Sequence, residues 1–391
     1  MDSARAALVR LSGAAFVAYC SYSICRAPLL PLFARELGAG PSLVGFVMAA
    51  STLTGVLVKL PAGALSDLLG RRRLLLAGAV VFAILPFTYL AVSALTVLVA
   101  LRFLHGSATA IFGPVASASL SDIAPPGRRG AWLSTYSTAQ GTGQALGPVV
   151  AGYLLAAGRI DAAFAISGLI GLSVPLIVSA GTRGWRNPPA AAPARPSWRE
   201  FTRGIREVAR DRLVLITSGA HAAQFVLNGT LNAFLPLYGR DVLHLSAAEL
   251  GWLFALQTVV TLLVRPGIGL LSDRVGRRAV IVTGLATCGS AVFALSLAAD
   301  LAAVLAVIVV YAAGVAVTTA ATSAYITDLT SRARYGAAHG VFGTIYDIGD
   351  ALGPISAGML VATLGYARMF QTMAAVTLLA ALGFMAGSRR R

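Results

Sequence analysis

Two aspartates lie three residues apart in an otherwise apolar stretch, "YDIGDALGPISAG" at 346–358. Asp347 and Asp350 share one face of a helix, because residues three apart are neighbours on a helix surface. If the helix begins near Gly336, they lie about 16 Å and 21 Å along it, near the middle of a hydrocarbon core about 30 Å thick. A carboxylate there costs on the order of 3 kcal/mol, so we expect these acids to have a function.

Three roles are open for the two acids. A carboxyl that gains and loses a proton as access alternates would couple transport to protons. The acids could instead contact a cationic substrate, or form a fixed ion pair with Arg26 or Arg102, which lie in other apolar stretches. An intramembrane arginine faces protein or water, or extends toward an interface.

The composition indicates a membrane protein. Hydrophobic residues make up 57% of the 391 residues and charged residues only 12%, against about 25% charged in a soluble domain. The long continuous apolar runs exclude a β-barrel. The net charge of +16 lies mostly in loops, so we predict no nucleic acid partner. The three cysteines have no metal-ligand spacing, and neither a metal site nor a cofactor is predicted.

Twelve apolar runs predict twelve membrane-spanning helices. They cover 8–33, 43–66, 74–93, 95–118, 130–157, 161–181, 212–238, 248–270, 278–298, 301–325, 336–362 and 366–387. A basic, proline-rich stretch at 182–211 ends in a short amphipathic pattern, which indicates a cytoplasmic linker with a helix on the membrane surface. We therefore expect six-helix bundles at 1–181 and 212–391, joined by this linker.

The basic residues predict the orientation. Of the 31 lysines and arginines, only Arg35, Arg159, Arg240 and Arg368 fall in loops on the side opposite the N-terminus. Positively charged loops stay in the cytoplasm, so both termini should be cytoplasmic in a multi-pass protein of the cell inner membrane.

The two bundles are sequence repeats, offset by 206 residues. "GALSDLLGRR" at 63–72 matches "GLLSDRVGRR" at 269–278, and 121–152 matches 327–358. Parallel repeats with a binding site between them near the membrane midplane are typical of transporters. The positions aligned with Asp347 and Asp350 are Gly141 and Gln144, so the acids are an asymmetry added to the repeat.

Three motifs carry a resemblance to a known family. The loop pattern G-x-L-x-D-x-x-G-R-R occurs at 63–72 and again at 269–278, and "LRFLHGSATA" at 101–110 carries Arg102 and Gly106. With these motifs the chain resembles the major facilitator superfamily over essentially its whole length. "GQALGPVVAGYL" at 143–154 resembles the fifth-helix motif of its twelve-helix drug–proton antiporters, although Ala151 replaces the first glycine of the motif's final pair.

The resemblance implies a conformational latch in the two loops. Asp67 would pair with a charge or a helix N-terminus at the cytoplasmic face, a contact that breaks as the repeats rock. The loops could instead only anchor the topology. The implied latch residues are Gly63, Asp67, Gly70, Arg71, Arg72, Asp273 and Arg277.

The resemblance also implies a sealed helix contact and a substrate cavity. Gly143, Gly147, Pro148 and Gly152 would form a kinked, closely packed segment that limits leak, or serve only general packing. Arg102 would take part in proton transfer with the two acids. The cavity would be lined by Tyr22, Arg26, Gln140, Gln144, Gln224, Asn228, Asn232, Asp347 and Asp350. These polar residues could instead be interhelical hydrogen-bonding groups.

The function predicted is secondary active transport. We expect a monomeric, proton-coupled exporter of small, partly apolar compounds, in contact with membrane lipid. A metabolite, sugar or organic-anion transporter, exporter or importer, is the alternative within transport, because two central arginines could bind an anionic group. No nucleotide-binding loop appears in the sequence. A membrane enzyme or sensor is disfavoured, because neither a convergent catalytic set nor an extra soluble domain is visible.

Overall fold

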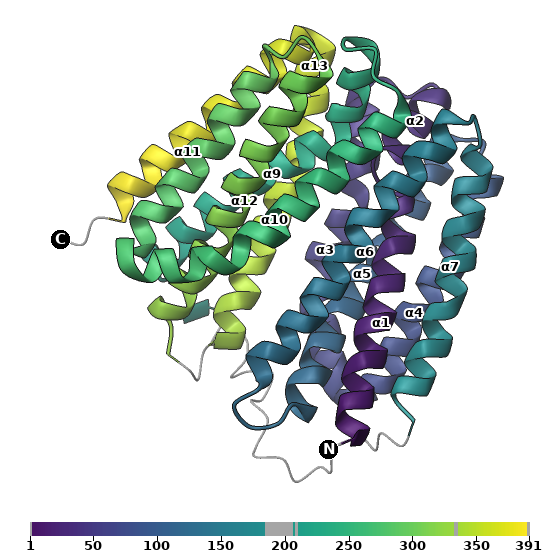
Figure 1. The fold of residues 1–391 in the computed structure, drawn as a ribbon, viewed down its shortest axis with the longest axis vertical. Helices are drawn as coiled ribbons and strands as arrows, with labels where there is room; N and C mark the ends of the chain where they lie inside the picture. The colour runs from purple at the N-terminus through teal and green to yellow at the C-terminus, as the bar shows by residue number, and fades with distance from the viewer. Residues whose placement is uncertain (1, 184–205, 208–209, 332–334, 389–391) are drawn as a thin grey trace. The chain divides into compact units, whose positions relative to one another are not determined.

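The computed structural model describes residues 2–183, 206–207, 210–331 and 335–388 (Figure 1). In these residues the regular structure is helical, and no strand is present. The helices are α1 (Asp2–Ile24), α2 (Leu29–Glu36), α3 (Pro41–Leu69), α4 (Arg71–Thr88), α5 (Leu95–Ile123), α6 (Arg129–Ala156), α7 (Ile160–Gly181), α9 (Arg212–Asp241), α10 (Ala247–Val275), α11 (Arg277–Leu295), α12 (Leu301–Leu329) and α13 (Tyr335–Gly387), with a 3-10 turn at Tyr89–Ala91.

The prediction of an all-α membrane protein is confirmed. Among the described residues, nine helical segments are long and apolar enough to cross a membrane. α6 and α9, which carry the glutamines and asparagines of the predicted cavity, are not among the nine. The amphipathic linker helix predicted within 182–211 lies largely outside the described residues.

Two predicted spans differ from the observed helices. The run at 8–33 is divided into α1 and α2 by a break at 25–28 that contains Arg26 and Pro28, where a proline cannot continue the helical hydrogen bonding. The last two runs form the single segment α13, interrupted at Gly365 by a backbone φ of 76°.

The described chain forms two compact units. Unit 1 comprises Met1–Gly40, Phe46–Pro189 and Leu235–Val259, and unit 2 comprises Pro41–Gly45, Ala190–Phe234 and Val260–Arg391. Each unit therefore contains most of one sequence repeat and a short segment of the other. The segment 41–45, which belongs to unit 2, aligns at the repeat offset with 247–251, which lies within the segment 235–259 that belongs to unit 1.

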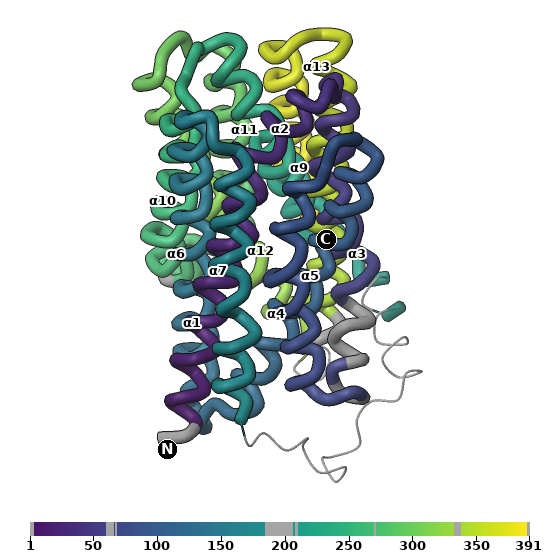
Figure 2. Tube along the Cα trace, turned by 90° about the vertical axis from the view of Figure 1, so that its right-hand side faces the viewer, coloured from purple at the N-terminus to yellow at the C-terminus, as the bar shows by residue number. Residues whose placement is uncertain are grey.

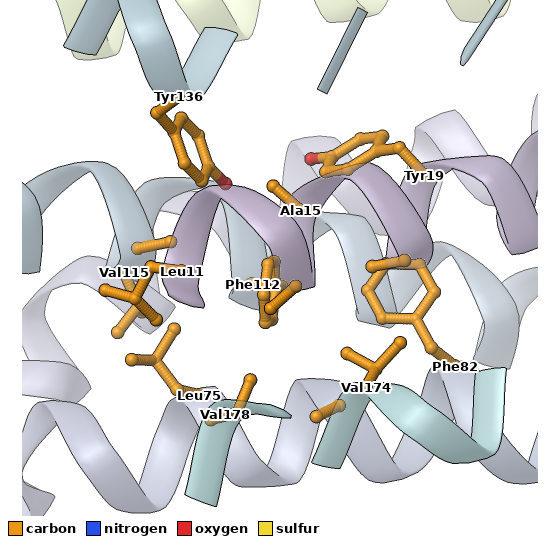
Figure 3. Close-up of a cluster of buried hydrophobic side chains, with 14 of the residues drawn as sticks. Leu11, Ala15, Tyr19, Leu75, Phe82, Phe112, Val115, Tyr136, Val174 and Val178 are labelled. Atoms are coloured by element: carbon orange, nitrogen blue, oxygen red, sulfur yellow. The ribbon is translucent and has the colours of Figure 1, made fainter. Parts of the chain in front are cut away.

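The core of unit 1 is formed by side chains of α1, α4, α5, α6 and α7. Figure 2 shows α1 beside α6 and α7. Leu11, Phe82, Phe112 and Val174 are fully buried in this core (Figure 3). Glycines let the helix backbones approach: a side chain on Gly143 would collide with the carbonyl of Phe16 on α1. In lipid no hydrophobic effect drives two helices together, so the close van der Waals packing that glycine permits stabilises such a contact instead.

The same glycine contacts recur in unit 2. Gly349 on α13 faces the carbonyl of Ala222 on α9, and Gly353 faces that of Val226. These positions are the repeat equivalents of the contacts that Gly143 and Gly147 make with α1. The repeat seen in the sequence is thus also a repeat of backbone packing.

Gly276 is the N-cap of α11. Its backbone has a φ of 96° and a ψ of 133°, a conformation that residues with a Cβ rarely adopt. We expect Gly276→Ala to destabilise the protein by roughly 1–3 kcal/mol, which thermal unfolding in detergent would detect. Gly267→Ala is the matched control, because Gly267 lies inside α10 with open space around it. It should melt no earlier than the wild type. Equal melting of all three proteins would refute the assignment of strain.

Candidate functional site

The two acids lie buried on α13, in unit 2. Asp347 is 5% exposed and Asp350 is 8% exposed. Asn228 on α9 donates a hydrogen bond from its Nδ2 to Oδ1 of Asp350 over 3.0 Å. A side chain at Gly229 would collide with the Asp350 carbonyl, so this glycine brings α9 and α13 close enough for the bond.

The three predicted cavity residues on α9, Gln224, Asn228 and Asn232, have three different environments. Asn228 binds Asp350, whereas Asn232 donates from Nδ2 to the carbonyl of Asn228 on its own helix, at 2.8 Å. Gln224 is buried, and its Oε1 accepts no hydrogen bond from the described residues. One of the three amides therefore contacts an acid directly.

Aromatic side chains lie on α9 and α13, the two helices that the hydrogen bond between Asn228 and Asp350 joins. The rings of Phe225 and Tyr346 stack with centroids 4.6 Å apart, and His221 packs edge-on to both. Thr322 and His221 share a hydrogen bond of 3.1 Å. The sequence analysis did not identify these aromatic residues. Phe225 lies three residues before Asn228 and Tyr346 four residues before Asp350, a spacing that was a usable signal.

A second polar group surrounds Arg102 in unit 1. Arg102 is completely buried, and its Nη2 donates to Oγ of Ser51 on α3 at 2.6 Å. Its guanidinium lies 5.8 Å from the ring centre of Tyr22, within the range of a cation–π contact. Gly106, one turn along α5, allows this approach because its Cα lies against the backbone of Ser51.

The Arg102 group has hydrogen-bonding capacity left over. Within the part of the chain that the structure describes, Nε and Nη1 of Arg102 have no hydrogen-bond partner, and no carboxylate of unit 1 pairs with the guanidinium. His105 is buried beside it and shares a hydrogen bond of 3.2 Å with the Tyr89 hydroxyl. A buried cation without an anionic partner is costly, so its retention indicates a function.

The remaining predicted cavity residues of unit 1 occupy two places. Arg26 lies at the break between α1 and α2, is half-buried, and acts electrostatically on Tyr22. Gln140 and Gln144 lie half-buried on α6, on either side of Gly143. Tyr22, Arg26 and Arg102 therefore form one group, while the two glutamines lie on α6, next to the glycines that contact α1.

The loop motif makes the same contacts in both repeats. Arg71 pairs with Asp122 at 2.7 Å, and Arg277 pairs with Asp328 at 3.0 Å. Each pair joins the helix after the loop to the next helix, α4 to α5 and α11 to α12. Asp122 and Asp328 were missed in the sequence analysis, although they occupy equivalent positions of the repeat.

The neighbouring arginines follow the repeat as well. Arg72 donates to Thr182 at 3.3 Å, and Arg278 donates to Ser388 at 2.9 Å. Asp273 pairs with Arg277 on its own loop at 2.5 Å. The structure describes only the helical backbone at Gly63 and Asp67, and neither the Asp67 side chain nor the surroundings of the two residues. The latch predicted for them therefore stays a prediction.

The α6 motif packs against two helices. Gly143 and Gly147 contact α1, while Gly152 lies against Ala247, where a Cβ would meet the carbonyl oxygen at 2.5 Å. One residue further, the Tyr153 hydroxyl accepts a hydrogen bond from Trp252 Nε1 at 3.3 Å. The motif therefore connects α1 and α10 within unit 1.

A family model described as Major Facilitator Superfamily matches residues 11–248 and 217–391. The chain belongs to the major facilitator superfamily. Curated members include an uncharacterized MFS-type transporter of Methanocaldococcus jannaschii, which is 25% identical over 88% of this chain and 89% of its own length.

Two further relatives match only part of the chain. A probable actinorhodin transporter of Streptomyces coelicolor is 29% identical over 43% of this chain and 29% of its own length. The quinolone resistance protein NorA of Staphylococcus aureus is 25% identical over 32% of this chain and 33% of its own length.

Solved superfamily structures share the fold. A bacterial homologue of the human lysosomal transporter Spinster superposes with a TM-score of 0.85 at 16% identity, covering 99% of this chain and 97% of its own. The nucleoside transporter NupG superposes with a TM-score of 0.79 at 15% identity, covering 98% and 100%. The superfamily assignment identifies a multi-pass membrane transporter rather than an enzyme.

Proposed function

We propose that this superfamily member is a proton-coupled exporter of small, partly apolar compounds, working by alternating access in the inner membrane as a monomer. One observation carries the proposal: two carboxyl groups, Asp347 and Asp350, are almost fully buried on a membrane-spanning helix. Acids in such segments commonly mark proton relays in transporters. The partial similarity to a quinolone resistance protein and a probable actinorhodin transporter supports export of partly apolar compounds.

In this mechanism each group has a defined task. Asp350 holds or releases the proton at its carboxyl oxygens, and the Asn228 amide orients the carboxylate by donating to Oδ1. Asp347 is the second candidate carrier, because it lies on the same helix face and is equally buried. The stacked rings of Phe225 and Tyr346 offer apolar surface on the same two helices. We further propose that the substrate path is lined by Gln140, Gln144, Gln224 and Asn232. The conformational latch would be formed by Gly63, Asp67, Gly70, Arg71, Arg72, Asp273 and Arg277. The glycines of α6 would limit leak.

The Arg102 group favours a second candidate within transport. Two guanidinium nitrogens lack partners in the described residues, and the surrounding groups, Ser51, Tyr22 and His105, include no acid. A guanidinium with free donors binds carboxylates and phosphates well. An organic-anion transporter would use these donors for its substrate.

Purified protein in proteoliposomes tests the proposed function. A panel of partly apolar compounds, with cationic, neutral and anionic members, would be added while the internal pH is recorded. Substrate-dependent proton movement in the direction opposite to the compound is expected. Transport that proceeds without any proton movement would remove the coupling proposal, and transport restricted to anions would favour the second candidate.

The proposed topology has its own test. Epitope tags at residue 195 and at the C-terminus should be accessible only from the cytoplasm, and a tag in the loop at 242–245 should be accessible only from outside, because the arginine-rich loops stay in the cytoplasm. Protease protection in sealed vesicles of both orientations measures this. A tag at 195 accessible from outside would overturn the predicted orientation.

A further inference from the structure

Arg265 is a cation on α10 that the proposed mechanism does not use. It lies within Ala247–Gly269, an apolar segment long enough to cross a membrane. Ten residues, about 15 Å of helix, separate it from the end of α10 at Val275. An arginine inside such a segment faces protein or water rather than lipid, and arginines of this kind commonly mark functional sites.

The position of Arg265 on α10 shows which way its side chain points. Leu263 is 75% exposed, and Arg265 follows it by two residues, which places the two side chains on opposite sides of the helix. The guanidinium acts electrostatically on His221 of α9 and on Tyr346 of α13. Arg265 therefore points toward these helices of unit 2, and its exposed side chain is accessible to a ligand.

Two stacked aromatic rings near Arg265 have accessible surface. The ring centres of Phe225 and Tyr346 are 4.6 Å apart, and both side chains are only partly buried. Buried rings hold this pair in place, because His221 packs edge-on to both and Phe342 packs against His221 and Tyr346. A partly exposed aromatic pair can pack against the ring of a ligand.

Hydrogen bonds fix the orientation of the His221 ring. The hydroxyl of Thr322 donates its single proton to the carbonyl of Thr318 over 2.7 Å. It must therefore accept the bond of 3.1 Å that it shares with His221, so Nδ1 of the imidazole carries a proton and donates it. The imidazole is thus held in one orientation, which makes the aromatic pair that packs on it rigid.

The two acids lie on the same helix as Tyr346. Asp347 is the next residue, and Asp350 lies about 6 Å further along α13 than Tyr346. Asn228, which donates to Asp350, is itself partly exposed. None of the ion pairs between described residues includes Arg265. One cation, one aromatic pair and two carboxyl groups are therefore brought together by α9, α10 and α13, and all of them belong to unit 2.

We propose that this group binds zwitterionic aromatic compounds: the carboxylate pairs with Arg265, the ring packs on the Phe225–Tyr346 pair, and the ammonium pairs with the two acids. A guanidinium binds a carboxylate through two parallel hydrogen bonds. A ligand with a single charge leaves the opposite group of the site uncompensated, so charges of both signs select a zwitterion. The inference rests on the proposed transport of small, partly apolar compounds, and not on proton coupling.

Four compounds on one scaffold test the charge pattern. They are para-aminomethylbenzoate, which carries both charges, para-methylbenzylamine, para-methylbenzoate and the neutral para-methylbenzyl alcohol. Calorimetry on purified protein in nanodiscs measures their binding without a proton gradient. The wild type should bind the zwitterion at least tenfold more tightly than each of the others, because each contact with a charged group that is lost costs about tenfold in affinity.

Arg265→Gln should remove the preference for the zwitterion over the amine. This variant should bind the zwitterion at least tenfold more weakly than the wild type does, and the amine at least as tightly, since only acids then remain in the site. Arg265→Lys keeps the charge without the planar fork and should retain part of the preference. Arg274→Gln removes an exposed arginine from the last turn of the same helix and is the matched control. It should bind all four compounds as the wild type does.

The acids and the rings are tested by separate variants. Asp347→Asn combined with Asp350→Asn should lose the preference for the zwitterion over para-methylbenzoate. Phe225→Leu should weaken binding of all four compounds by a similar factor, because packing on the rings does not depend on the ligand's charge. A misfolded protein would lose binding of every compound and would not change the order of preference.

The proposal fails if the wild type binds none of the four compounds or binds the amine as tightly as the zwitterion. It also fails if Arg265→Gln keeps the wild-type preference. A protein that shows the predicted preference but moves no protons would retain this site and lose the coupling mechanism. A protein that couples other compounds to protons without preferring the zwitterion would retain the proposed function and lose this site.

Discussion

Asp350→Asn should reduce accumulation of substrate against a gradient at least tenfold, while exchange of substrate across the membrane continues. The asparagine keeps an oxygen that can accept the hydrogen bond from Asn228, so the local packing survives. The asparagine cannot gain and release a proton, and without that step substrate transport is no longer coupled to proton movement. Uphill uptake driven by an imposed pH gradient, and counterflow exchange without one, measure the two activities in the same vesicles.

Stability separates this outcome from a structural role of the acid. Removing a buried carboxylate should leave the melting temperature unchanged or higher, since its burial is unfavourable. If Asp350 instead compensates a buried cation, the variant should lose roughly 3–5 kcal/mol and melt early.

Asp347→Asn, measured alongside, shows which of the two acids is essential. Asp161→Asn, an exposed acid in the first turn of α7, is the control for loss of one negative charge. Normal uphill transport in both Asp347→Asn and Asp350→Asn would remove both acids from the coupling mechanism.

Arg102→Met should abolish transport without lowering stability. The guanidinium is fully buried, it donates a hydrogen bond to Ser51, and among the described residues of unit 1 no carboxylate pairs with it. Removing a buried charge that has no ionic partner also removes its cost of desolvation, so the melting temperature should not fall. Thermal unfolding and the vesicle assay, on one preparation, measure both effects.

The substrate dependence of the Arg102 variants distinguishes the two candidate functions. If Arg102 serves proton transfer, Arg102→Met should lose uphill transport of neutral and anionic compounds alike. If Arg102 binds an anionic group, Arg102→Lys should retain some transport of the anions with a raised KM, because lysine keeps the charge but not the planar fork. Early melting of Arg102→Met would show instead that the contacts with Ser51 and Tyr22 are structural.

The sequence was a good guide to the helices and a partial guide to the site. Long apolar runs predicted the helical segments because hydrocarbon leaves the backbone no other way to satisfy its hydrogen bonds. The break at 25–28 was not predicted, since an apolar run containing a proline reads the same whether the helix bends or stops.

The partners of the site residues were harder to predict. Ser51 is 51 residues from Arg102, and Asn228 is 122 residues from Asp350. Such pairs depend on how two helices are rotated and shifted against each other, which hydrophobicity alone does not determine. The repeat could have identified Asp122 and Asp328, because an acid recurs at the same offset as the arginines it contacts.

Arg35 at the end of α2 and Asp241 at the end of α9 occupy equivalent positions of the two repeats and form a salt bridge. This pair constrains how such a chain can have arisen. In a homodimer of two identical half-length proteins, a residue on the twofold axis meets a copy of itself, so an arginine faces an arginine and an acid faces an acid. The opposite charges of Arg35 and Asp241 are available only to copies whose sequences have diverged. Divergence of the two repeats thus gives them a charge complementarity that symmetry forbids to identical subunits.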